Sequence, residues 1–283
     1  MLRSCRQNVK MSIILYRDHM VREIDGADTI EIMEKHFLDC YKSRSLCKRK
    51  DFGGKSTIVI GRYSVLPYYR ELEYDLAING CVLINTYRQH HFIANIEEWY
   101  QVLEGLTPKT WHLPAELPEG KSFVLKGATN SRKAKWKTHM FAEDRNAAKE
   151  IHLRLIDDDM IYNQGIYARE YVPLVKLGEQ VNGMPVTNEY RFFVCKGQIL
   201  CGGFYWSSEK EECDPKPDVS RVPESLLKEA ITRIGDRATF YTIDVAETQT
   251  GDWIIIEIND GQMAGLSDID ADLFYSRLSK VVD

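Results

Sequence analysis

The chain contains the stretch Phe240-Tyr-Thr-Ile-Asp-Val-Ala-Glu247, closely followed by Thr250-Gly-Asp-Trp-Ile-Ile-Ile-Glu-Ile-Asn259. Both stretches are apolar and strand-like, and a turn between them predicts a β-hairpin. Glu257 and Asn259 are two residues apart, so on a strand their side chains point to the same face. The hairpin can also bring Asp244 beside them, which places three oxygen ligands at one spot.

Oxygen ligands on rigid strands suit Mg2+ that is shared with a nucleotide, because few protein ligands leave positions for water and phosphate. The structural alternative is a half-buried hairpin with solvated acids at its rim. The apolar run Ile254-Ile-Ile256 argues against exposure, since carboxylates in such a run carry a desolvation cost that a cation can offset. We therefore predict a Mg2+ site at Asp244, Glu257 and Asn259.

The composition is typical of a soluble enzyme or binding protein, with 44% hydrophobic and 28% charged residues. A chain of 283 residues can hold two or three subdomains around a substantial core. No apolar run approaches the length of a membrane span, and the N-terminus lacks the hydrophobic core of a signal peptide. We therefore expect a cytoplasmic protein.

The cysteines and the net charge argue against several kinds of site. The seven cysteines are odd in number and form no Cys-x-x-Cys pair, which indicates neither a disulfide framework nor a zinc site. The net charge of −5 gives no global footprint for nucleic acid, although a local basic patch is compatible with it.

Prolines indicate the domain organisation. Pro108, Pro114 and Pro118 mark a linker between an N-terminal α/β domain at residues 11–113 and the remainder of the chain at 119–283. Residues 1–10 are expected to form a flexible extension, because Met11 could be a second start site.

Hydrophobic spacing predicts individual elements. Apolar residues recur at helical intervals over Thr29–Tyr41, which predicts a helix. Glu189–Cys195 and Gln198–Tyr205 are strand-like and are joined by a Lys-Gly turn, which predicts a second hairpin.

A nucleotide can be bound by the first segments after the linker. A strand at Ser122–Lys126 is followed by a basic loop at 127–139, a helix at 142–156 and a strand at 165–172 that stops at Pro173. The loop can cover phosphates, while unpaired backbone groups at the end of the later strand can meet a base. The lysine that ends the first strand would neutralise a phosphate, although lysines at strand ends are more often solvated.

In this order, the elements resemble the ATP-grasp superfamily. The matching segments span Ser122 to Leu266, about half of the chain: Phe123-Val-Leu-Lys126, Ala168-Arg-Glu-Tyr-Val172, Glu189-Tyr-Arg-Phe-Phe193, Ile243-Asp-Val245 and Ile256-Glu-Ile-Asn259. The resemblance implies an α+β ATP-grasp fold, preceded by the smaller α/β N-terminal domain. Two α+β subdomains would clasp ATP: 119–172 with the lysine and phosphate loop, and 173–283 with the metal site.

A narrower resemblance extends into the N-terminal half. The segments that carry it are Ile60–Arg70, Leu83-Ile-Asn85, Gln89-His90 and Thr107-Pro-Lys-Thr-Trp111. They look like a mostly uncharacterised branch of ATP-grasp proteins found in bacteria and phages. This branch is similar in its ATP site to the eukaryotic cell-division-cycle protein that assembles a translation initiation factor.

By position, the resemblance implies roles for individual residues: Lys126 on the ATP phosphates, Glu170, Tyr171 and Val172 at the adenine hinge, and Asp244, Glu257 and Asn259 on Mg2+. Arg191 falls where many members place an arginine near the transferred phosphate, so Lys126 and Arg191 are the predicted catalytic residues. The phosphate loop lacks the family's usual glycines. Lys133, Lys135 and Lys137 can compensate by charge, and Lys137 is assigned to the cofactor site.

A typical ATP-grasp ligase transfers a phosphoryl group from ATP to a carboxylate, and an amine then attacks the acyl phosphate. We therefore expect an ATP- and Mg2+-dependent ligase that acts on carboxylate and amine substrates, either small molecules or peptides and proteins. Two alternatives stay open: an ATP-binding assembly factor without turnover, and an RNA-repair or nucleotidyl-transfer enzyme. The sequence carries no signal for the oligomeric state.

The acceptor substrate is expected among polar and aromatic clusters before the ATP-binding half. Arg62 and Lys109 are the predicted substrate residues. The tandem His90-His91 is expected to have one buried and one exposed ring, because neighbours on a strand face opposite ways.

Overall fold

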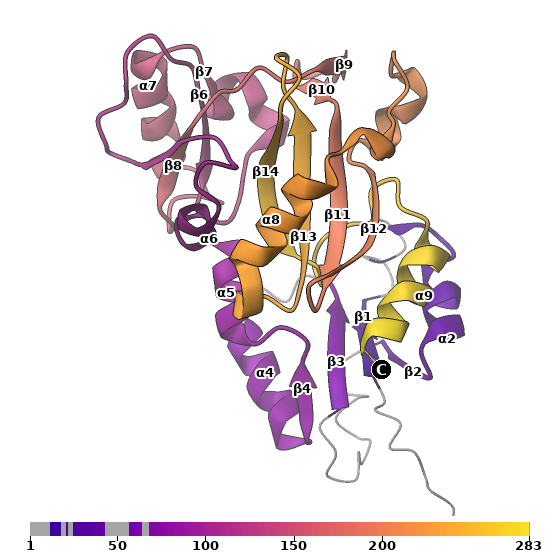
Figure 1. Ribbon diagram of the computed structural model, residues 1–283. Helices are drawn as coiled ribbons and strands as arrows, with labels where there is room; N and C mark the ends of the chain where they lie inside the picture. Colours follow the sequence, from indigo (N-terminus) through magenta and orange to yellow (C-terminus); the bar gives the residue numbers. More distant parts are fainter. Residues whose placement is uncertain (1–11, 18–20, 22–24, 43–56, 64–67, 283) are drawn as a thin grey trace, which may run out of the picture.

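The computed structural model describes residues 12–17, 21, 25–42, 57–63 and 68–282. The predicted extension 1–10 lies outside these residues. Three main sheets form the molecule, and the largest lies in the middle, with a smaller sheet above it on one side and a third sheet below it (Figure 1). No helix in the described ranges has both the length and the apolar character needed to cross a membrane.

The first unit of the chain is a parallel sheet with helices around it. Its strands are β1 (Ser12–Tyr16), β2 (Asp39–Tyr41), β3 (Thr57–Arg62) and β4 (Cys81–Leu83), in the order β2-β1-β3-β4. Its helices are α2 (Thr29–His36), α4 (Tyr69–Ile78), α5 (Tyr87–Ala94) and α6 (Ile96–Leu103). The parallel order gives this unit the α/β character that was expected of the N-terminal part.

Two local expectations in this unit are corrected. The helix predicted over Thr29–Tyr41 ends at His36, because Phe37 is extended and Asp39–Tyr41 pairs with β1 as a parallel strand. Sheet pairing overrides the helical spacing here. His90 is buried and His91 is exposed, as expected, but both lie on helix α5 and not on a strand.

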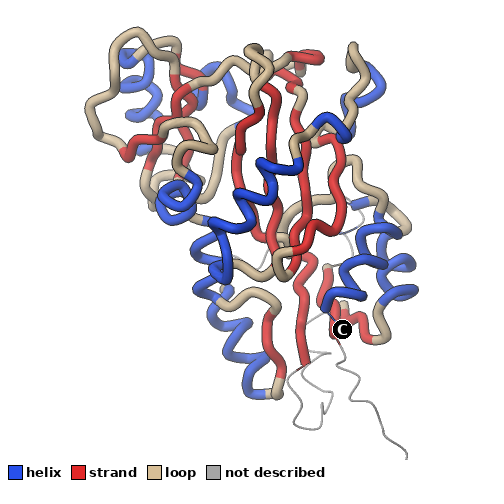
Figure 2. Tube along the Cα trace, viewed as in Figure 1, coloured by secondary structure: helices blue, strands red, loops and turns tan. Residues whose placement is uncertain are grey.

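The central sheet contains both predicted hairpins. Its antiparallel strands are β11 (Glu189–Cys195), β12 (Gln198–Phe204), β13 (Phe240–Glu247) and β14 (Trp253–Asp260), in the order β12-β11-β13-β14 (Figure 2). Successive side chains alternate between two faces. Tyr190 and Val194 lie in the same core as helix α8 (Glu224–Ile234), whereas Phe193 and Cys195 lie in the core of helix α9 (Ala271–Val282).

The third sheet carries the predicted lysine strand. Its strands are β5 (Thr110–His112), β6 (Phe123–Gly127), β7 (Phe141–Ala142) and β8 (Ile166–Glu170), in the order β5-β8-β6-β7, with helix α7 (Arg145–Ile156) in its core. β5 pairs with β8 although it falls in the range 11–113. The domain limits stay a prediction, and this pairing ties the end of the first range to the lysine sheet.

Short elements complete the chain around the lysine sheet and the central sheet. A small hairpin, β9 (Lys176–Glu179) and β10 (Pro185–Thr187), follows the hinge, and the predicted phosphate loop contains the helical turns η1 (Lys133–Lys135) and η2 (Trp136–Met140). The turns η3 (Ser207–Glu212), η4 (Val219–Arg221) and η5 (Gly235–Arg237) flank helix α8.

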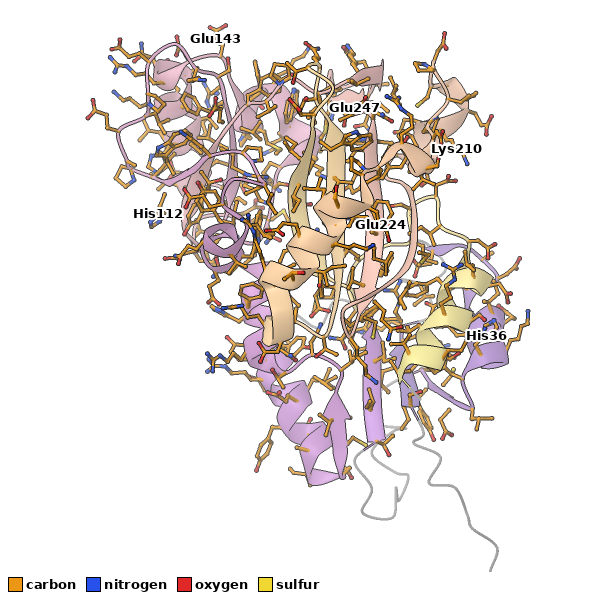
Figure 3. All side chains as sticks on the ribbon, viewed as in Figure 1. His36, His112, Glu143, Lys210, Glu224 and Glu247 are labelled. Carbon is orange, nitrogen blue, oxygen red and sulfur yellow. The ribbon has the colours of Figure 1, made fainter. Side chains whose placement is uncertain are left out.

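The last helix packs on the first unit. Phe274, Tyr275 and Leu278 of α9 share a core with α2. At the edge of this contact, His36, labelled in Figure 3, lies 2.8 Å from Asp272. The first unit is therefore completed by residues from the far end of the chain.

Asn85 joins the first unit to the central hairpin. Its Nδ2 donates to the Phe240 carbonyl over 2.6 Å and to Asp260 over 3.0 Å, and its Oδ1 accepts from the backbone of Thr239 and Phe240. Asp260 also lies 2.9 Å from Nδ1 of His90. All of these groups are close to the end of β14, so the network holds that end in place.

We expect Asn85→Ala to lower the free energy of unfolding by about 3 kcal/mol, because it leaves several buried donors and acceptors without partners. Urea denaturation followed by circular dichroism measures this change. Asn79→Ala, which removes one local hydrogen bond in the same unit, serves as the control and should cost less than about 1 kcal/mol. Equal losses in the two variants would contradict the role of Asn85.

Candidate active site

The central hairpin brings the three predicted metal ligands together. Asp244 on β13 lies directly opposite Glu257 on β14, and Asn259 lies two residues further along β14, opposite Thr242. Asp244 is fully buried, whereas Glu257 and Asn259 are half-buried. The hairpin therefore gathers two carboxylates and an amide on one face of the sheet.

Arg191 holds Asp244 through a bidentate ion pair. Its Nε and Nη2 donate to the two carboxylate oxygens over 2.8 and 2.7 Å, and its Nη1 donates to the Gly265 carbonyl over 3.1 Å. Burial raises the pKa of Asp244, and the charge and hydrogen bonds of Arg191 oppose this effect. The planar fork of arginine suits such a pair and fixes the geometry of both side chains.

Lys126 holds Glu257 in the same way. Its Nζ, at the end of β6, donates to Glu257 over 2.9 Å, so the ion pair links the lysine sheet to the central sheet. Burial alone would raise the pKa of Glu257. The ammonium groups of Lys126 and Lys133 outweigh burial and hold this pKa well below its usual range, so Glu257 is ionised.

A cavity of about 200 Å3 opens beside Glu257 between the two sheets. Its wall includes Lys126, the hinge residues Glu170, Tyr171 and Val172, and Glu257. The remaining wall is mainly apolar and aromatic: Val124, Trp136, Met140, Leu174, Met184, Pro185, Trp206, Ile254 and Ile256. An apolar slot with a charged end is suited to a planar base that carries phosphates.

The hinge is held open at its backbone edge. β8 ends at Glu170, whose N–H donates to the Lys109 carbonyl, and the Tyr171 N–H donates to the Ser122 carbonyl. Val172 follows before Pro173, which has no N–H to donate. The backbone of Val172 therefore lines the cavity at a point where the strand has ended.

Two lysines of the phosphate loop lie in different surroundings. Lys133 lines the cavity, and its Nζ donates to the Tyr205 hydroxyl over 2.6 Å. Lys137, which was assigned from the sequence, is exposed and lies against Gly183, in the loop between β9 and β10. The role predicted for Lys137 stays a prediction, and the structure adds Lys133 as a candidate.

Glu189 is a further cavity residue that was not predicted. One oxygen accepts a hydrogen bond from the Thr187 hydroxyl over 3.1 Å, and the residue is 5% exposed. Burial raises the pKa of Glu189 to about 7, although Lys133 acts in the opposite direction. Its position two residues before Arg191 was visible in the sequence, but nothing there showed that its strand face was the cavity face.

The predicted substrate residues lie outside this cavity. Arg62 is buried and donates to Asp25 over 2.6 Å, to Tyr275, and to the carbonyls of Gly261, Gln262 and Ala264. Lys109 lines a separate open groove of about 650 Å3 that also includes Glu170. Their roles at a substrate stay predictions.

The donor set fits Mg2+ that is shared with phosphates. The side chain of Asn259 makes no hydrogen bond to the described residues, and the Thr242 hydroxyl beside it is buried without a partner. Among those residues, no group of three His, Cys, Asp or Glu side chains could hold a metal ion by itself. Few protein ligands plus phosphate oxygens are the usual environment of nucleotide-bound Mg2+.

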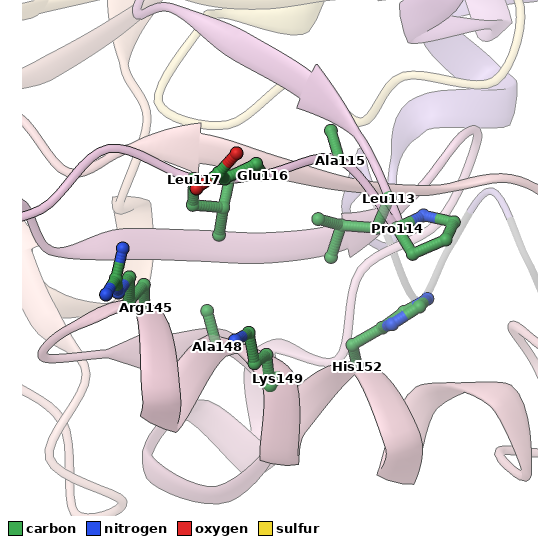
Figure 4. A pocket seen from close by; sticks show the side chains of 9 residues that line it. All are labelled: Leu113, Pro114, Ala115, Glu116, Leu117, Arg145, Ala148, Lys149 and His152. Atoms are coloured by element: carbon green, nitrogen blue, oxygen red, sulfur yellow. The ribbon is translucent and has the colours of Figure 1, made fainter.

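A second cavity, of about 330 Å3, lies between α7 and the loop after β5 (Figure 4). Arg145, Lys149 and His152 from one side of α7 and Leu113 and Leu117 from the loop are among its lining residues. It shares no lining residue with the cavity at Glu257. The predicted site residues therefore gather at the other cavity.

The three sheets and the Lys126–Glu257 cavity define an ATP-grasp protein. Residues 116–278, more than half of the chain, match the model of an ATP-grasp domain family, the third family of its clade. The chain belongs to this family. The predicted α+β ATP-grasp fold is thereby confirmed, whereas the likeness to the eukaryotic assembly protein stays a prediction.

Solved structures show the same fold at low identity. D-cycloserine synthetase DcsG is 12% identical with a TM-score of 0.60, over 96% of this chain and 100% of that one. The ATP-grasp ligase PsnB, complexed with a minimal precursor, is 11% identical with a TM-score of 0.56, over 97% and 99%. A RimK domain ATP-grasp protein from Sphaerobacter thermophilus is 14% identical with a TM-score of 0.57, over 96% and 99%. No curated protein matches the sequence.

We expect Glu189→Gln to remove part of the pH dependence of stability. The folded protein keeps the Glu189 proton up to about pH 7, whereas the unfolded chain releases it near 4.5. The stability that the proton provides is therefore complete below pH 4.5 and is lost as the pH rises through 7. At pH 8 the variant should be more stable by up to about 3 kcal/mol.

Urea denaturation from pH 4 to 8 measures this difference. Glu179→Gln, at an exposed position, is the control and should leave the wild-type pH profile intact. Parallel stability curves for wild type and Glu189→Gln would show that Glu189 titrates normally.

Proposed function

We propose that this protein is an ATP- and Mg2+-dependent ligase that joins a carboxylate to an amine through an acyl phosphate. The observation that carries the proposal is the pair of ionised contacts Lys126–Glu257 and Arg191–Asp244 at one end of an apolar cavity. Family membership supports ATP as the cofactor. The neighbours named as ligases support the reaction class.

The cavity residues divide into a part for the base and a part for the phosphates. The backbone at Glu170 and Val172 would meet the edge of adenine, with Ile254 and Ile256 against its ring. Lys126 and Lys133 would neutralise the phosphates, because both lysines line the cavity near Glu257. This division matches the apolar and charged ends of the cavity.

Glu257, Asn259 and Asp244 would hold Mg2+. The ion would neutralise the phosphate charge as the phosphoryl group leaves. Glu257 uses one oxygen for Lys126, and both oxygens of Asp244 accept from Arg191. Each carboxylate oxygen has further lone pairs, so these contacts are compatible with a cation.

Arg191 and Lys126 would stabilise the charge that moves with the phosphoryl group. Arg191 is held by Asp244 and Gly265, so its orientation is set before a substrate arrives. Preorganised charges of this kind supply most of the rate increase in phosphoryl transfer. Residues that only position and neutralise are therefore sufficient, and a protein nucleophile is not required.

Labelled ATP, incubated with the protein and a cell extract, tests the reaction. ADP is the expected product, because phosphoryl transfer to a carboxylate releases it. AMP would instead indicate nucleotidyl transfer, as in the RNA-repair alternative. Binding of MgATP without any turnover would indicate the assembly-factor alternative.

We expect Glu257→Gln to abolish Mg2+-dependent binding of ATP while the fold is retained, because the amide removes the charge that attracts the cation. Isothermal titration with ATP at fixed Mg2+ measures the affinity, and circular dichroism checks the fold. Glu247→Gln, on the neighbouring strand and outside the cavity lining, is the control and should bind like wild type. Unchanged affinity in Glu257→Gln would refute the metal assignment.

Paired variants separate the two loop lysines. Lys133→Met should weaken ATP binding by about 10-fold to 100-fold, since a charged hydrogen bond contributes about 1.5–3 kcal/mol. Lys137→Met should change the affinity by less than about threefold, because its side chain lies outside the cavity lining. Titration of each variant with MgATP gives both values, and the opposite ranking would assign the phosphate contact to Lys137.

A further inference from the structure

Strand β14 is irregular one residue before Glu257. Asp244 pairs with Glu257 and Val245 pairs with Ile255, so Ile256 is an extra residue without a partner on β13. A β-bulge of this kind bends a strand and re-aims the neighbouring side chain, and it is often found beside active sites. The direction of the Glu257 carboxylate therefore depends on how the bulge is held.

Arg169 on β8 holds this bulge from the lysine sheet. Its Nη1 donates to the Ile256 carbonyl over 2.6 Å, and its Nη2 donates to the Thr107 hydroxyl over 2.7 Å. The Thr107 hydroxyl donates in turn to the Ile255 carbonyl over 2.8 Å. Two successive carbonyls of the bulged segment are thus tied to one guanidinium, directly or through Thr107.

The environment of Arg169 is unusual for a buried cation. Its side chain is 7% exposed, its Nε is buried without a hydrogen-bond partner, and its guanidinium lies 5.6 Å from the ring of Trp99. Burial lowers the pKa of Arg169 to about 10, and the charge of Glu257 opposes this effect. A buried cation that is not paired with a carboxylate is costly for folding, so its presence calls for an explanation outside stability.

Arg169 also lies between the two ends of the nucleotide cavity. It directly precedes the hinge residue Glu170 on β8, and it lines the same cavity as Lys126 and Glu257. Its hydrogen bond to Ile256 crosses from the lysine sheet to the central sheet. One side chain therefore connects the part of the cavity at the hinge with the strand that carries the acid.

We propose that Arg169 is a positioning residue of the nucleotide site, which fixes the Glu257 carboxylate relative to the hinge by holding the β-bulge at Ile256. Arg169 acts through Ile256 and Thr107 and not by contact with a reacting atom. The inference rests on the proposed function, in which Glu257 holds the metal that accompanies ATP. It adds that the metal affinity of Glu257 depends on a residue of the other subdomain.

The first test measures metal binding. Mn2+ replaces Mg2+, so that electron paramagnetic resonance can follow the bound ion in the presence of a non-hydrolysable ATP analogue. Arg169→Met should weaken Mn2+ binding by about tenfold or more, while adenosine binding without metal changes by less than about threefold. Arg169→Lys, which keeps the charge but not the two-armed contact, should be intermediate. Lys121→Met is the matched control, because it removes a cation beside Glu170 that does not touch the bulge.

The second test needs no nucleotide. Hydrogen–deuterium exchange should be faster in peptides that cover Ile255–Asn259 in Arg169→Met and in Thr107→Val, with no change in α8. The double variant should resemble Arg169→Met alone, because both residues act on one bulge. Unchanged exchange in β14, or an equal loss of Mn2+ and adenosine affinity, would overturn the role of Arg169. A wild-type protein that binds no Mn2+-nucleotide would overturn the proposed function, and the exchange data would still decide on Arg169.

Discussion

A carboxylate that is buried between β-strands stays charged only when a cation compensates for the lost water, and two such carboxylates organise this molecule. Asp244 receives Arg191 from the neighbouring strand of the same sheet, and Glu257 receives Lys126 from a different sheet. The first pair is internal to the central sheet, whereas the second bridges the two walls of the cavity. The same charges that bind the walls together therefore create the electrostatic field that a nucleotide and its metal would meet.

The central hairpins were predictable because their signals are local. Asp244, Glu257 and Asn259 could be placed on one face from the strand period alone, and the register confirms that Asp244 and Glu257 are opposite each other. The ATP-grasp fold was predictable from the order of the segments, since no single segment is specific. The hinge and Lys126 gained their meaning only from this order, and both line the cavity.

The remaining features depend on contacts between distant segments, which spacing cannot reveal. The end of α2 was missed because strand pairing with β1 competes with the helical pattern up to Tyr41. Lys133 and Lys137 are equivalent in the sequence, and only the path of the loop distinguishes them. Arg169 was quoted within the hinge segment without a role, because its partners Thr107 and Ile256 are far away along the chain.

The packing of α9 on α2 has a consequence for biosynthesis. Residues of β1 and α2 share their core with Phe274, Tyr275 and Leu278, which leave the ribosome last among these elements. The early sheet must therefore wait, with apolar surface uncovered, while most of the polypeptide is translated. Contacts between the two ends of a chain form slowly, and uncovered surface of this kind favours aggregation or chaperone capture of nascent chains.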